Sequence, residues 1–359
     1  MRRMLSRVVV MGGGTGTYVV LTGLKKYPID LTAVVSMADS GGSTGALRTE
    51  LGILPPGSVR PALIALSGSP QLMRDLFTYR FPKGKLKGHV LGNLLLAGLV
   101  GVTGDFTEAL KEAAQILAIR GKVVPVTTTD AHLVATLKNG RRIHGEGRID
   151  ARGKGDPISS VALQPAARAT RDALQAIQQA DLVVIGPGDL YTSIVPNLLV
   201  KGIPEALRRA RATVVYVVNV MTKPGETDGF TVRTFVSEME RYVGRGVIDV
   251  VIVNTGRPSA SLLRRYRRQD QDLVTFSRDE VSQLQYEVIA GGLISQKELI
   301  RHNPDKLAAV LIEVLLRGRM NALRRPAAIR WQTIPRGGIA GGALPGDEAR
   351  RAKRFRRGL

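Results

Sequence analysis

The chain has 359 residues, of which 44% are hydrophobic and 23% are charged, and this balance excludes wholesale disorder. It has no cysteine, which excludes a disulfide framework, a thiolate zinc site and a cysteine nucleophile. Its formal net charge of +22 indicates anionic partners, a class that includes nucleotides, phosphosugars and nucleic acid.

The amino-terminal region gives an expectation about location. Residues 1–7 are basic and lead directly into a strand pattern, with no signal-peptide cleavage site. No apolar run reaches the roughly 20 residues that a membrane span needs. We therefore expect a cytoplasmic protein without a membrane span.

The first 45 residues have the pattern of a βαβ unit. Residues 7–11 form a short, continuous apolar run, which is typical of a strand buried on both faces, and glycines follow it. Residues 15–26 have a helical pattern, and residues 31–37 form a second strand. A second glycine-rich turn, residues 39–45, follows that strand. This order predicts a parallel α/β sheet.

The middle of the chain is predicted to be mostly helical. Helical patterns cover four segments, the first with Ser58 as its expected cap: residues 58–66, 72–79, 90–102 and 106–119. Beyond them the pattern changes to short strands, with a hairpin signal at Asn139-Gly140. We interpret residues 122–149 as a β-ribbon that is inserted into the parallel sheet or flanks it.

In the second half, strands and helices alternate again. Strands are expected at residues 181–185, 213–220 and 247–253, and helices at residues 191–200, 204–211, 230–243 and 304–319. This alternation predicts a Rossmann-like three-layer sandwich, a mostly parallel sheet with helices on both faces. We predict one nucleotide-binding domain, residues 1–325, and a flexible basic tail, residues 326–359, that contacts nucleic acid or other anions nonspecifically. Homo-oligomer formation is left open.

The glycine turn after the first strand is a candidate phosphate site. Gly13, Gly14, Thr15 and Gly16 open the first helix, whose free N–H groups and dipole favour an anion. The turn matches neither the Walker A motif nor the dinucleotide fingerprint. The alternative is a tight strand-to-helix turn without a ligand.

Further polar turns follow other strands and are expected at the same sheet edge. Asp39, after the second strand, suits a ribose hydroxyl, Mg²⁺ or a proton transfer, or else caps an Asx turn. Tyr191, after Gly186 and Gly188, stacks on a base or hydrogen-bonds a phosphate, or else is a half-buried tyrosine without a ligand. Residues 219–227 follow a further strand and form another candidate ligand loop.

Taken together, these motifs resemble one family. They occur in order between residues 7 and 255, as Gly12-Gly13-Gly14-Thr15-Gly16, Ala38-Asp39, Gly41-Gly42-Ser43, Pro55-Pro56-Gly57, Gly92-Asn93, Gly186-Pro187-Gly188, Pro196-Asn197, Asn219-Val220-Met221-Thr222 and Pro224-Gly225-Glu226-Thr227. The set resembles the YvcK family, the gluconeogenesis factors of bacteria, which belong with the CofD-type 2-phospho-L-lactate transferases.

The resemblance implies a Rossmann-like sheet with a nucleotide-sugar site at its carboxyl edge. YvcK-like proteins bind UDP-sugars such as UDP-N-acetylglucosamine and support cell-wall synthesis and cell shape during gluconeogenic growth. The CofD branch instead transfers a phospholactyl group from a guanosine diphosphate-linked donor to a deazaflavin, with Mg²⁺. The sequence therefore leaves two hypotheses, a nucleotide-sugar-binding regulator and a transferase, beside the nucleic-acid contact of the tail.

The resemblance also assigns roles. Residues 13–16 and 41–43 would hold the diphosphate, Asp39 and Asn93 the ribose or sugar hydroxyls, and Tyr191 and residues 219–227 the base or sugar. The candidate ligand-binding residues are Gly13, Gly14, Thr15, Gly16, Asp39, Gly41, Gly42, Ser43, Arg60, Asn93, Gly186, Gly188, Tyr191, Thr192, Asn197, Asn219, Met221, Thr222, Gly225, Glu226 and Thr227. Asp39 is the candidate catalytic residue and, for a transferase, the candidate Mg²⁺ ligand. The binding role requires no cofactor.

The chain departs from the family pattern at several positions. Ser40 stands where the family usually has a second Asp, which weakens the case for a Mg²⁺-dependent transferase. Ser58 replaces an Asp, although Arg60 fits the Arg that follows it. Asp189 replaces the usual Ser after Gly-Pro-Gly, so its carboxylate is expected to face sugar hydroxyls or a metal rather than phosphate.

Overall fold

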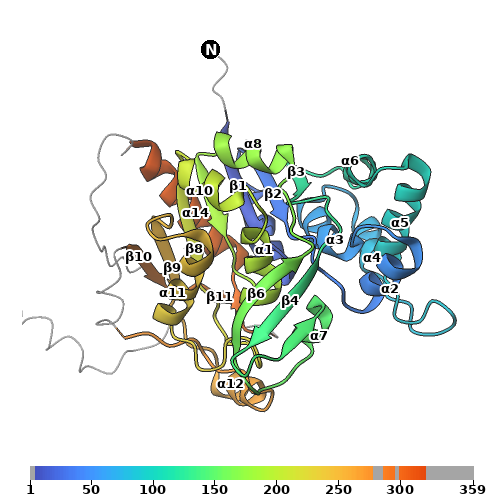
Figure 1. Ribbon diagram of the computed structural model, residues 1–359. Coiled ribbons are helices and arrows are strands. Elements are labelled where there is room, and N and C mark those ends of the chain that lie inside the picture. The colour runs from blue at the N-terminus through green and yellow to red at the C-terminus, as the bar shows by residue number, and fades with distance from the viewer. Residues whose placement is uncertain (1–4, 278–285, 296–298, 321–359) are drawn as a thin grey trace, which may run out of the picture.

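The computed structural model describes residues 5–277, 286–295 and 299–320 (Figure 1). Its main feature is a seven-stranded parallel sheet in the order β10-β9-β8-β7-β1-β2-β3. The strands are β1 (Ser6–Gly12), β2 (Ile29–Val35), β3 (Lys122–Pro125), β7 (Leu182–Ile185), β8 (Thr213–Val217), β9 (Val250–Asn254) and β10 (Glu287–Gly291). The sequence-based expectation of a Rossmann-like α/β fold is confirmed.

The central strands are continuously apolar because both faces of the sheet are covered. Along β1, Val8 and Val10 belong to one core cluster, whereas Val9 and Met11 belong to another on the opposite face. This is the period-2 alternation of a strand, with an apolar neighbour on each side. The expectation that the run of residues 7–11 is a strand buried on both faces is confirmed.

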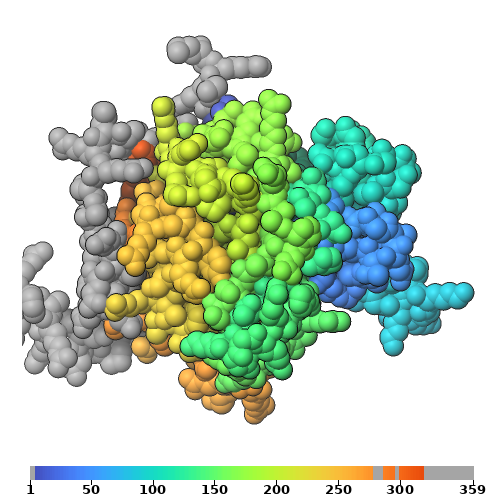
Figure 2. All heavy atoms as spheres, in the orientation of Figure 1, coloured from blue at the N-terminus to red at the C-terminus, as the bar shows by residue number. Residues whose placement is uncertain are grey.

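Helices pack on both faces of the sheet. The Val8 face is covered by α1 (Gly14–Leu24), α3 (Pro56–Leu66) and α14 (Pro304–Met320), and the Val9 face by α8 (Arg171–Gln179), α9 (Val195–Leu198), α10 (Ile203–Arg209) and α11 (Val232–Val243). A helical lobe projects to one side (Figure 2), and it is made of α2 (Gly42–Leu51), α4 (Gln71–Thr78), α5 (Leu91–Thr103) and α6 (Phe106–Ile116). The π-helix η1 (Leu190–Ile194), α12 (Ala260–Arg267), β11 (Ile294–Ser295) and β12 (Arg301–His302) complete the described elements.

The small antiparallel sheet differs from the predicted ribbon at residues 122–149. It has the order β5-β4-β6, with β4 (His132–Leu137), β5 (Arg142–His144) and β6 (Ile158–Gln164). The first predicted strand is instead β3, which pairs in parallel with β2 and so extends the main sheet. Residues 146–149 are not strand either, because helix α7 (Glu146–Asp150) begins after Gly145, whose φ of 95° ends the extended chain.

The start of α3 differs from the sequence-based expectation. Ser58 does not cap α3: the helix begins at Pro56 after the N-cap residue Pro55, and a proline in the first turn needs no N–H partner. The basic tail, residues 326–359, lies outside the described residues. Among the helices that the structure describes, we find none with the length and apolar character to cross a membrane.

The strand order reverses between β1 and β7, at the carboxyl edge of which a crevice is expected. The chain runs from β1 outward to β2 and β3, and later from β7 outward through β8, β9 and β10. Strands β1 and β7 are neighbours, so their carboxyl ends lie side by side at the point where the order reverses. Ligands of open α/β sheets bind at such a switch point.

Candidate functional site

Two glycine turns meet at the switch point in backbone contact. A Cβ atom added to Gly16 would lie 2.1 Å from the carbonyl oxygen of Pro187. The side chain of Asn219, which follows β8, accepts a hydrogen bond from the N–H of Gly188 at 3.1 Å. The loops after β1, β7 and β8 therefore form one continuous surface.

A cavity of about 230 Å³ opens over these loops. Helix α1 begins there, and its N-cap residue Gly13 offers no side-chain cap, while its first turn holds no acidic residue. The free N–H groups and the positive end of the helix dipole thus face the cavity region. The lining residues are Gly13, Gly14, Thr15, Gly16, Val19, Pro187, Gly188, Asp189, Ser193, Asn219, Val220, Met221, Thr222, Lys223, Tyr266, Gln271, Ile300, Arg301 and His302.

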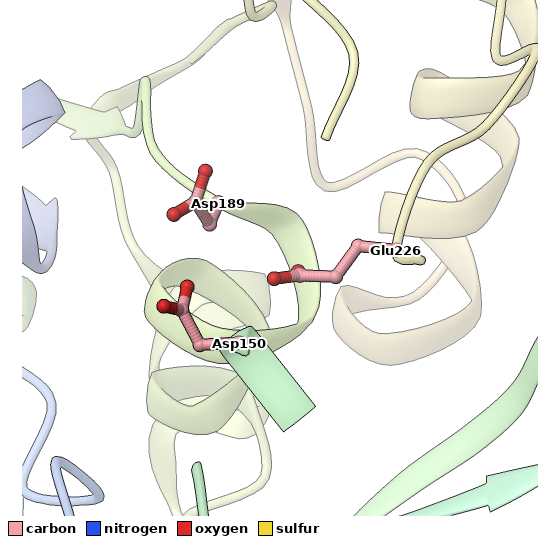
Figure 3. Close-up of side chains that lie close together, drawn as sticks. All are labelled: Asp150, Asp189 and Glu226. Carbon is pink, nitrogen blue, oxygen red and sulfur yellow. The ribbon is translucent and has the colours of Figure 1, made fainter. Parts of the chain in front are cut away.

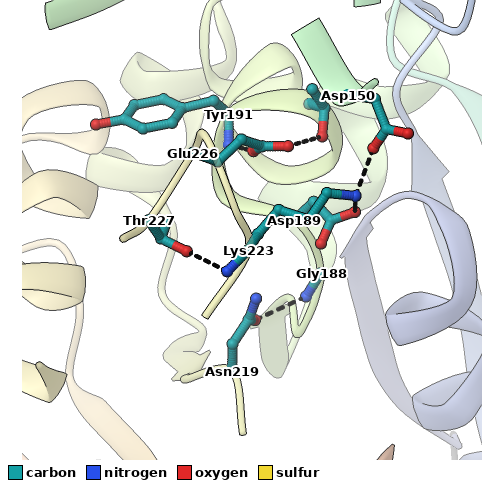
Figure 4. Close-up of polar contacts among 9 residues, drawn as sticks. Asp150, Gly188, Asp189, Tyr191, Asn219, Lys223, Glu226 and Thr227 are labelled. Carbon is teal, nitrogen blue, oxygen red and sulfur yellow. Dashed lines mark hydrogen bonds and ion pairs between the residues drawn. The ribbon is translucent and has the colours of Figure 1, made fainter. Parts of the chain in front are cut away.

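Three carboxyl groups converge beside this cavity. Asp150, Asp189 and Glu226 come from α7 and from the loops after β7 and β8, and one oxygen of each lies within 4.8 Å of the others (Figure 3). The ammonium group of Lys223 lies among them, 2.6 Å from Asp150 and 3.3 Å from Asp189 (Figure 4). The cluster therefore carries its own cation.

The electrostatics of the cluster show why Mg²⁺ does not fit it as it stands. Burial lowers the pKa of Lys223, but the carboxylates of Asp189 and Asp150 outweigh that effect and raise it overall, so the ammonium stays charged. Burial, and then the charge of Asp189, raise the pKa of Glu226 to about 8. The ammonium group of Lys223 occupies the space between Asp150 and Asp189, and an ammonium group is not the oxygen ligand that Mg²⁺ requires.

Glu226 makes the stability of the protein depend on pH. Because its folded pKa of about 8 exceeds the ordinary 4.5, the unfolded chain loses this proton first as pH rises. The stability that Glu226 contributes is present below pH 4.5 and is lost as the pH approaches 8. We expect Glu226→Gln, which keeps an acceptor for Tyr191 N–H and a partner for the Thr192 hydroxyl, to unfold with a shallower pH dependence over this range. Urea unfolding at pH 5, 6.5 and 8 gives the free energy of unfolding of both proteins. If that free energy changes with pH equally in the wild type and in Glu226→Gln, the prediction is wrong.

Apart from this cluster of three, Asp39 and Glu146 form a pair of carboxyl groups. Asp39 accepts a hydrogen bond from the N–H of Gly41 at 2.9 Å, and Glu146 accepts one from the N–H of Ser40 at 3.2 Å. Burial raises the pKa of Asp39, while burial and the charge of Asp39 raise the pKa of Glu146 to about 7. Glu146 thus brings a carboxyl group to the loop in which Ser40 replaces an acid. Such a pair suits proton transfer near neutral pH.

The predicted site residues divide into three groups. Eight line the cavity at the switch point: Gly13, Gly14, Thr15, Gly16, Gly188, Asn219, Met221 and Thr222. Gly41 and Gly42 line a second cavity, next to α7. The remaining predicted residues line neither cavity: Asp39, Ser43, Arg60, Asn93, Gly186, Tyr191, Thr192, Asn197, Gly225, Glu226 and Thr227.

Some members of the third group hold the loops in place. Asn197 donates to the carbonyl oxygens of Gly12 and Ser193, at 3.3 and 3.0 Å, and so joins the first glycine turn to η1. Asn93 accepts from Arg60 at 2.9 Å and donates to Ser43 at 3.3 Å. These side chains hold the two glycine turns in place without lining either cavity.

Tyr191 has the core role that the sequence offered as the alternative to base stacking. Its side chain is buried, and its hydroxyl donates to Glu238 at 2.9 Å. Burial and the nearby Glu238 carboxylate raise the pKa of Tyr191, so the hydroxyl keeps its proton. The expectation that this ring contacts the base is therefore corrected.

Three residues beside the cavities have no individual signal in the sequence: Lys223, Glu146 and Asp150. Lys223 lies inside the predicted loop 219–227, and its position as a cation among small polar residues was the available signal. Glu146 and Asp150 are four residues apart on α7 and contact different partners, whereas the sequence pattern predicts a strand over residues 142–149. The wrong periodicity therefore concealed their shared helix.

Comparison with known proteins is consistent with this geometry. The family profile described as "2-phospho-L-lactate transferase CofD" matches residues 8–294. The gluconeogenesis factor of Bacillus subtilis is 42% identical over 312 residues, covering 86% of this chain and 98% of that protein. The gluconeogenesis factor of Halalkalibacterium halodurans is 41% identical over 309 residues, covering 85% of this chain and 95% of that protein.

Solved structures show the same fold. The crystal structure of a Bacillus halodurans protein superposes with a TM-score of 0.83 at 40% sequence identity, covering 86% of this chain and 99% of that one.

Proposed function

This chain belongs to the CofD family, and from that membership and its likeness to bacterial gluconeogenesis factors we propose that it binds a nucleotide sugar of the UDP-N-acetylglucosamine type. In this proposal, ligand binding supports cell-wall synthesis and cell shape when the cell grows by gluconeogenesis. The protein acts as a regulator that reads the level of the nucleotide sugar, and it needs no cofactor for this role.

The observation that carries the proposal is the uncapped start of α1 at the switch point. The glycine turn leaves the N–H groups of the first helical turn without side-chain partners, directly beside the cavity. The phosphate groups of a diphosphate are anions that such a terminus accommodates. Arg301, which also lines the cavity, adds positive charge, whereas the charge of Lys223 is balanced by Asp150 and Asp189. Asn219 and Thr222 supply polar groups suited to ribose or sugar hydroxyls.

Calorimetric titration with UDP-N-acetylglucosamine, UDP and GDP, each with and without Mg²⁺, tests the proposal. We expect saturable heat that is selective for the uracil base, depends on the sugar and does not require Mg²⁺. Selectivity for GDP together with a Mg²⁺ requirement would favour the transferase instead. Absence of heat with all three ligands would refute nucleotide-sugar binding.

A substitution at Asn219 links the binding to this cavity. In Asn219→Ala, the N–H of Gly188 loses its acceptor and the cavity loses an amide, so we expect about tenfold weaker UDP-N-acetylglucosamine binding. Asn139→Ala is the matched control, because Asn139 is exposed in the hairpin turn of the small sheet. Equal affinities of the two variants, measured by the same titration, would place the ligand elsewhere.

One observation favours a second candidate function, transfer of a phospholactyl group from a nucleoside-diphosphate donor to a deazaflavin. Asp39 and Glu146 provide two carboxyl groups with raised pKa values at the edge of the sheet. Incubation with the guanosine diphosphate-linked donor, a deazaflavin acceptor and Mg²⁺, followed by chromatography, tests it. A donor that stays intact would refute the transferase.

A further inference from the structure

Helix α5 presents an apolar face at the outer edge of the helical lobe (Figure 1). None of its 13 residues is charged, and only three of them are buried. The exposed residues of the helix are Leu95, Gly98, Gly101 and Val102. Their spacing of three or four residues places them on one side of the helix. The proposed function leaves this face unused.

The helical lobe as a whole exposes more apolar surface than its share of the chain would give. Among the residues that the structure describes, twelve large apolar side chains are exposed, and seven of them lie between residues 72 and 116. On α5 itself, Val102 is 86% exposed and Leu95 is 41% exposed. Apolar surface that is concentrated in this way marks an interaction site.

The two exposed glycines of α5 have no packing reason within the chain. Glycine destabilises the interior of a helix relative to alanine, and it is expected there where another backbone approaches closely. Gly92 has such a reason, because an added Cβ would lie 2.4 Å from the carbonyl oxygen of Phe77. Apart from the backbone of its own helix, an added Cβ at Gly98 or Gly101 would meet nothing within 4 Å in the described part of the chain. The helix backbone is therefore open to a second helix from outside.

We propose that α5 packs against α5 of a second copy of this chain in a symmetric dimer. The chain carries a net charge of +22, so two copies repel each other, whereas the exposed face of α5 places no charge in the contact. An isologous contact needs one face that is complementary to itself, and glycines flanked by Leu95 and Val102 provide it. A bilayer surface suits the face less well, because an interfacial helix carries Lys or Arg along one side and α5 has neither. The proposal does not depend on the proposed function.

Charge also selects the antiparallel arrangement of the two helices. The loop before α5 carries three exposed lysines, Lys83, Lys85 and Lys87, and leads into the start of the helix. A parallel pair would bring both lysine loops together at one end, whereas an antiparallel pair places them at opposite ends. With the twofold axis beside the glycines, Leu95 of each copy faces Val102 of the other.

Sedimentation equilibrium of the full chain over a wide range of concentrations tests the dimer. We expect the apparent mass to rise from that of one chain toward that of two. Val102→Lys puts like charges into the contact and should raise the dimer dissociation constant about tenfold or more. Leu316→Lys adds the same charge at an exposed leucine of α14 and should leave the constant unchanged. Equal constants in the two variants would overturn the proposal.

The same experiment addresses the other occupants of the face. A wild-type chain that stays monomeric at every concentration would overturn the proposal. If such a monomer floats with phosphatidylglycerol vesicles and Val102→Lys does not, the face belongs to a membrane contact instead.

An added methyl group at Gly98 should have effects of opposite sign on the fold and on the dimer. At concentrations where the chains are separate, Gly98→Ala should stabilise the protein, because alanine favours the helix. In the dimer the same methyl group keeps the two backbones apart, so the dissociation constant should rise about tenfold. If Gly98→Ala associates as tightly as the wild type, the two backbones are not in close contact and the proposal is wrong.

Disulfide cross-linking tests the antiparallel arrangement, because the chain contains no cysteine of its own. Leu95→Cys and Val102→Cys are prepared as separate proteins and are oxidised with diamide, each alone and as a mixture. We expect a cross-linked dimer to form quickly only in the mixture, where the two positions face each other. Cross-links that form no faster in the mixture than in either protein alone would contradict this arrangement.

Discussion

Gly16→Ala is expected to lower the free energy of unfolding by about 2–4 kcal/mol and to weaken nucleotide-sugar binding more than tenfold. The added Cβ would lie 2.1 Å from the carbonyl oxygen of Pro187 and 2.9 Å from the nitrogen of Gly188. Both neighbours are backbone atoms, so the loops after β1 and β7 must move apart. That movement opens the place where the diphosphate is proposed to bind.

Two other glycine substitutions isolate the steric cause. Gly13→Ala changes the same turn, but its Cβ would meet Ser193 only at ordinary contact distances of 3.5–3.7 Å, so it should fold as stably as the wild type. Gly98→Ala lies in α5 with open space around it and should stabilise the protein by about 0.5–1 kcal/mol. Denaturant unfolding and calorimetric titration measure all three variants. A Gly16→Ala protein as stable as Gly98→Ala would show that the loops are not in contact.

The sequence predicted those parts of the fold and site in which the signal is local. A continuous apolar run followed by glycines predicted that β1 is buried on both faces in a parallel sheet, and the polar turns after β1, β2, β7 and β8 were expected to meet at its carboxyl edge. Both expectations follow from rules about one strand and the residues directly after it. The turns after β1, β7 and β8 line one cavity, whereas Gly41 and Gly42 in the turn after β2 line another.

The parts that the sequence did not predict depend on contacts between distant segments. The carboxyl group of Glu146 meets the backbone of Ser40 across 106 residues, and Asp150 meets Lys223 across 73 residues. Nothing in the neighbourhood of Glu146 indicates its partner. Its helix is also only five residues long and begins after a hairpin, so alternation of residue types within segment 142–149 was read as strand.

The direction in which a side chain points was also not predictable from the sequence. Tyr191 was placed correctly at the strand-end turn, but a π-helix carries its ring into the core, where Glu238 on α11 accepts its hydroxyl. A sequence pattern indicates which loop holds a residue, whereas packing decides which side of the loop the ring occupies. The same argument applies to Asn93, which is bonded to Arg60 and Ser43.

Lys223→Met is the second substitution with a large expected effect. The ammonium group lies 2.6 Å from Asp150 and 3.3 Å from Asp189, and the lysine side chain is only 22% exposed. Its removal leaves two carboxylates close together without a cation. Since the carboxylates are 43% and 38% exposed, water screens part of their repulsion, and we expect a loss of about 1–3 kcal/mol, between the values for surface and buried pairs. Nucleotide-sugar affinity should fall as well, because a cavity-lining charge is lost.

The effect of Mg²⁺ on the unfolding midpoint tests whether Lys223 occupies a position that a cation can fill. In the wild type the ammonium of Lys223 occupies the position between the carboxylates, so Mg²⁺ should not change the unfolding midpoint. In Lys223→Met the oxygens of Asp150, Asp189 and Glu226 remain within 4.8 Å of one another, and a divalent ion can replace the missing charge. We therefore expect Mg²⁺ to raise the midpoint of the variant alone.

The matched control removes an exposed lysine that pairs with a single carboxylate. Lys154 pairs with Asp270 at 2.9 Å, but both side chains are more than half exposed, so Lys154→Met should leave the midpoint unchanged with or without Mg²⁺. If Mg²⁺ stabilises the wild type as much as Lys223→Met, the ammonium does not fill the cation position. If it stabilises only Lys223→Met, the ammonium group of Lys223 neutralises the carboxylates at the position that a divalent ion takes in the variant.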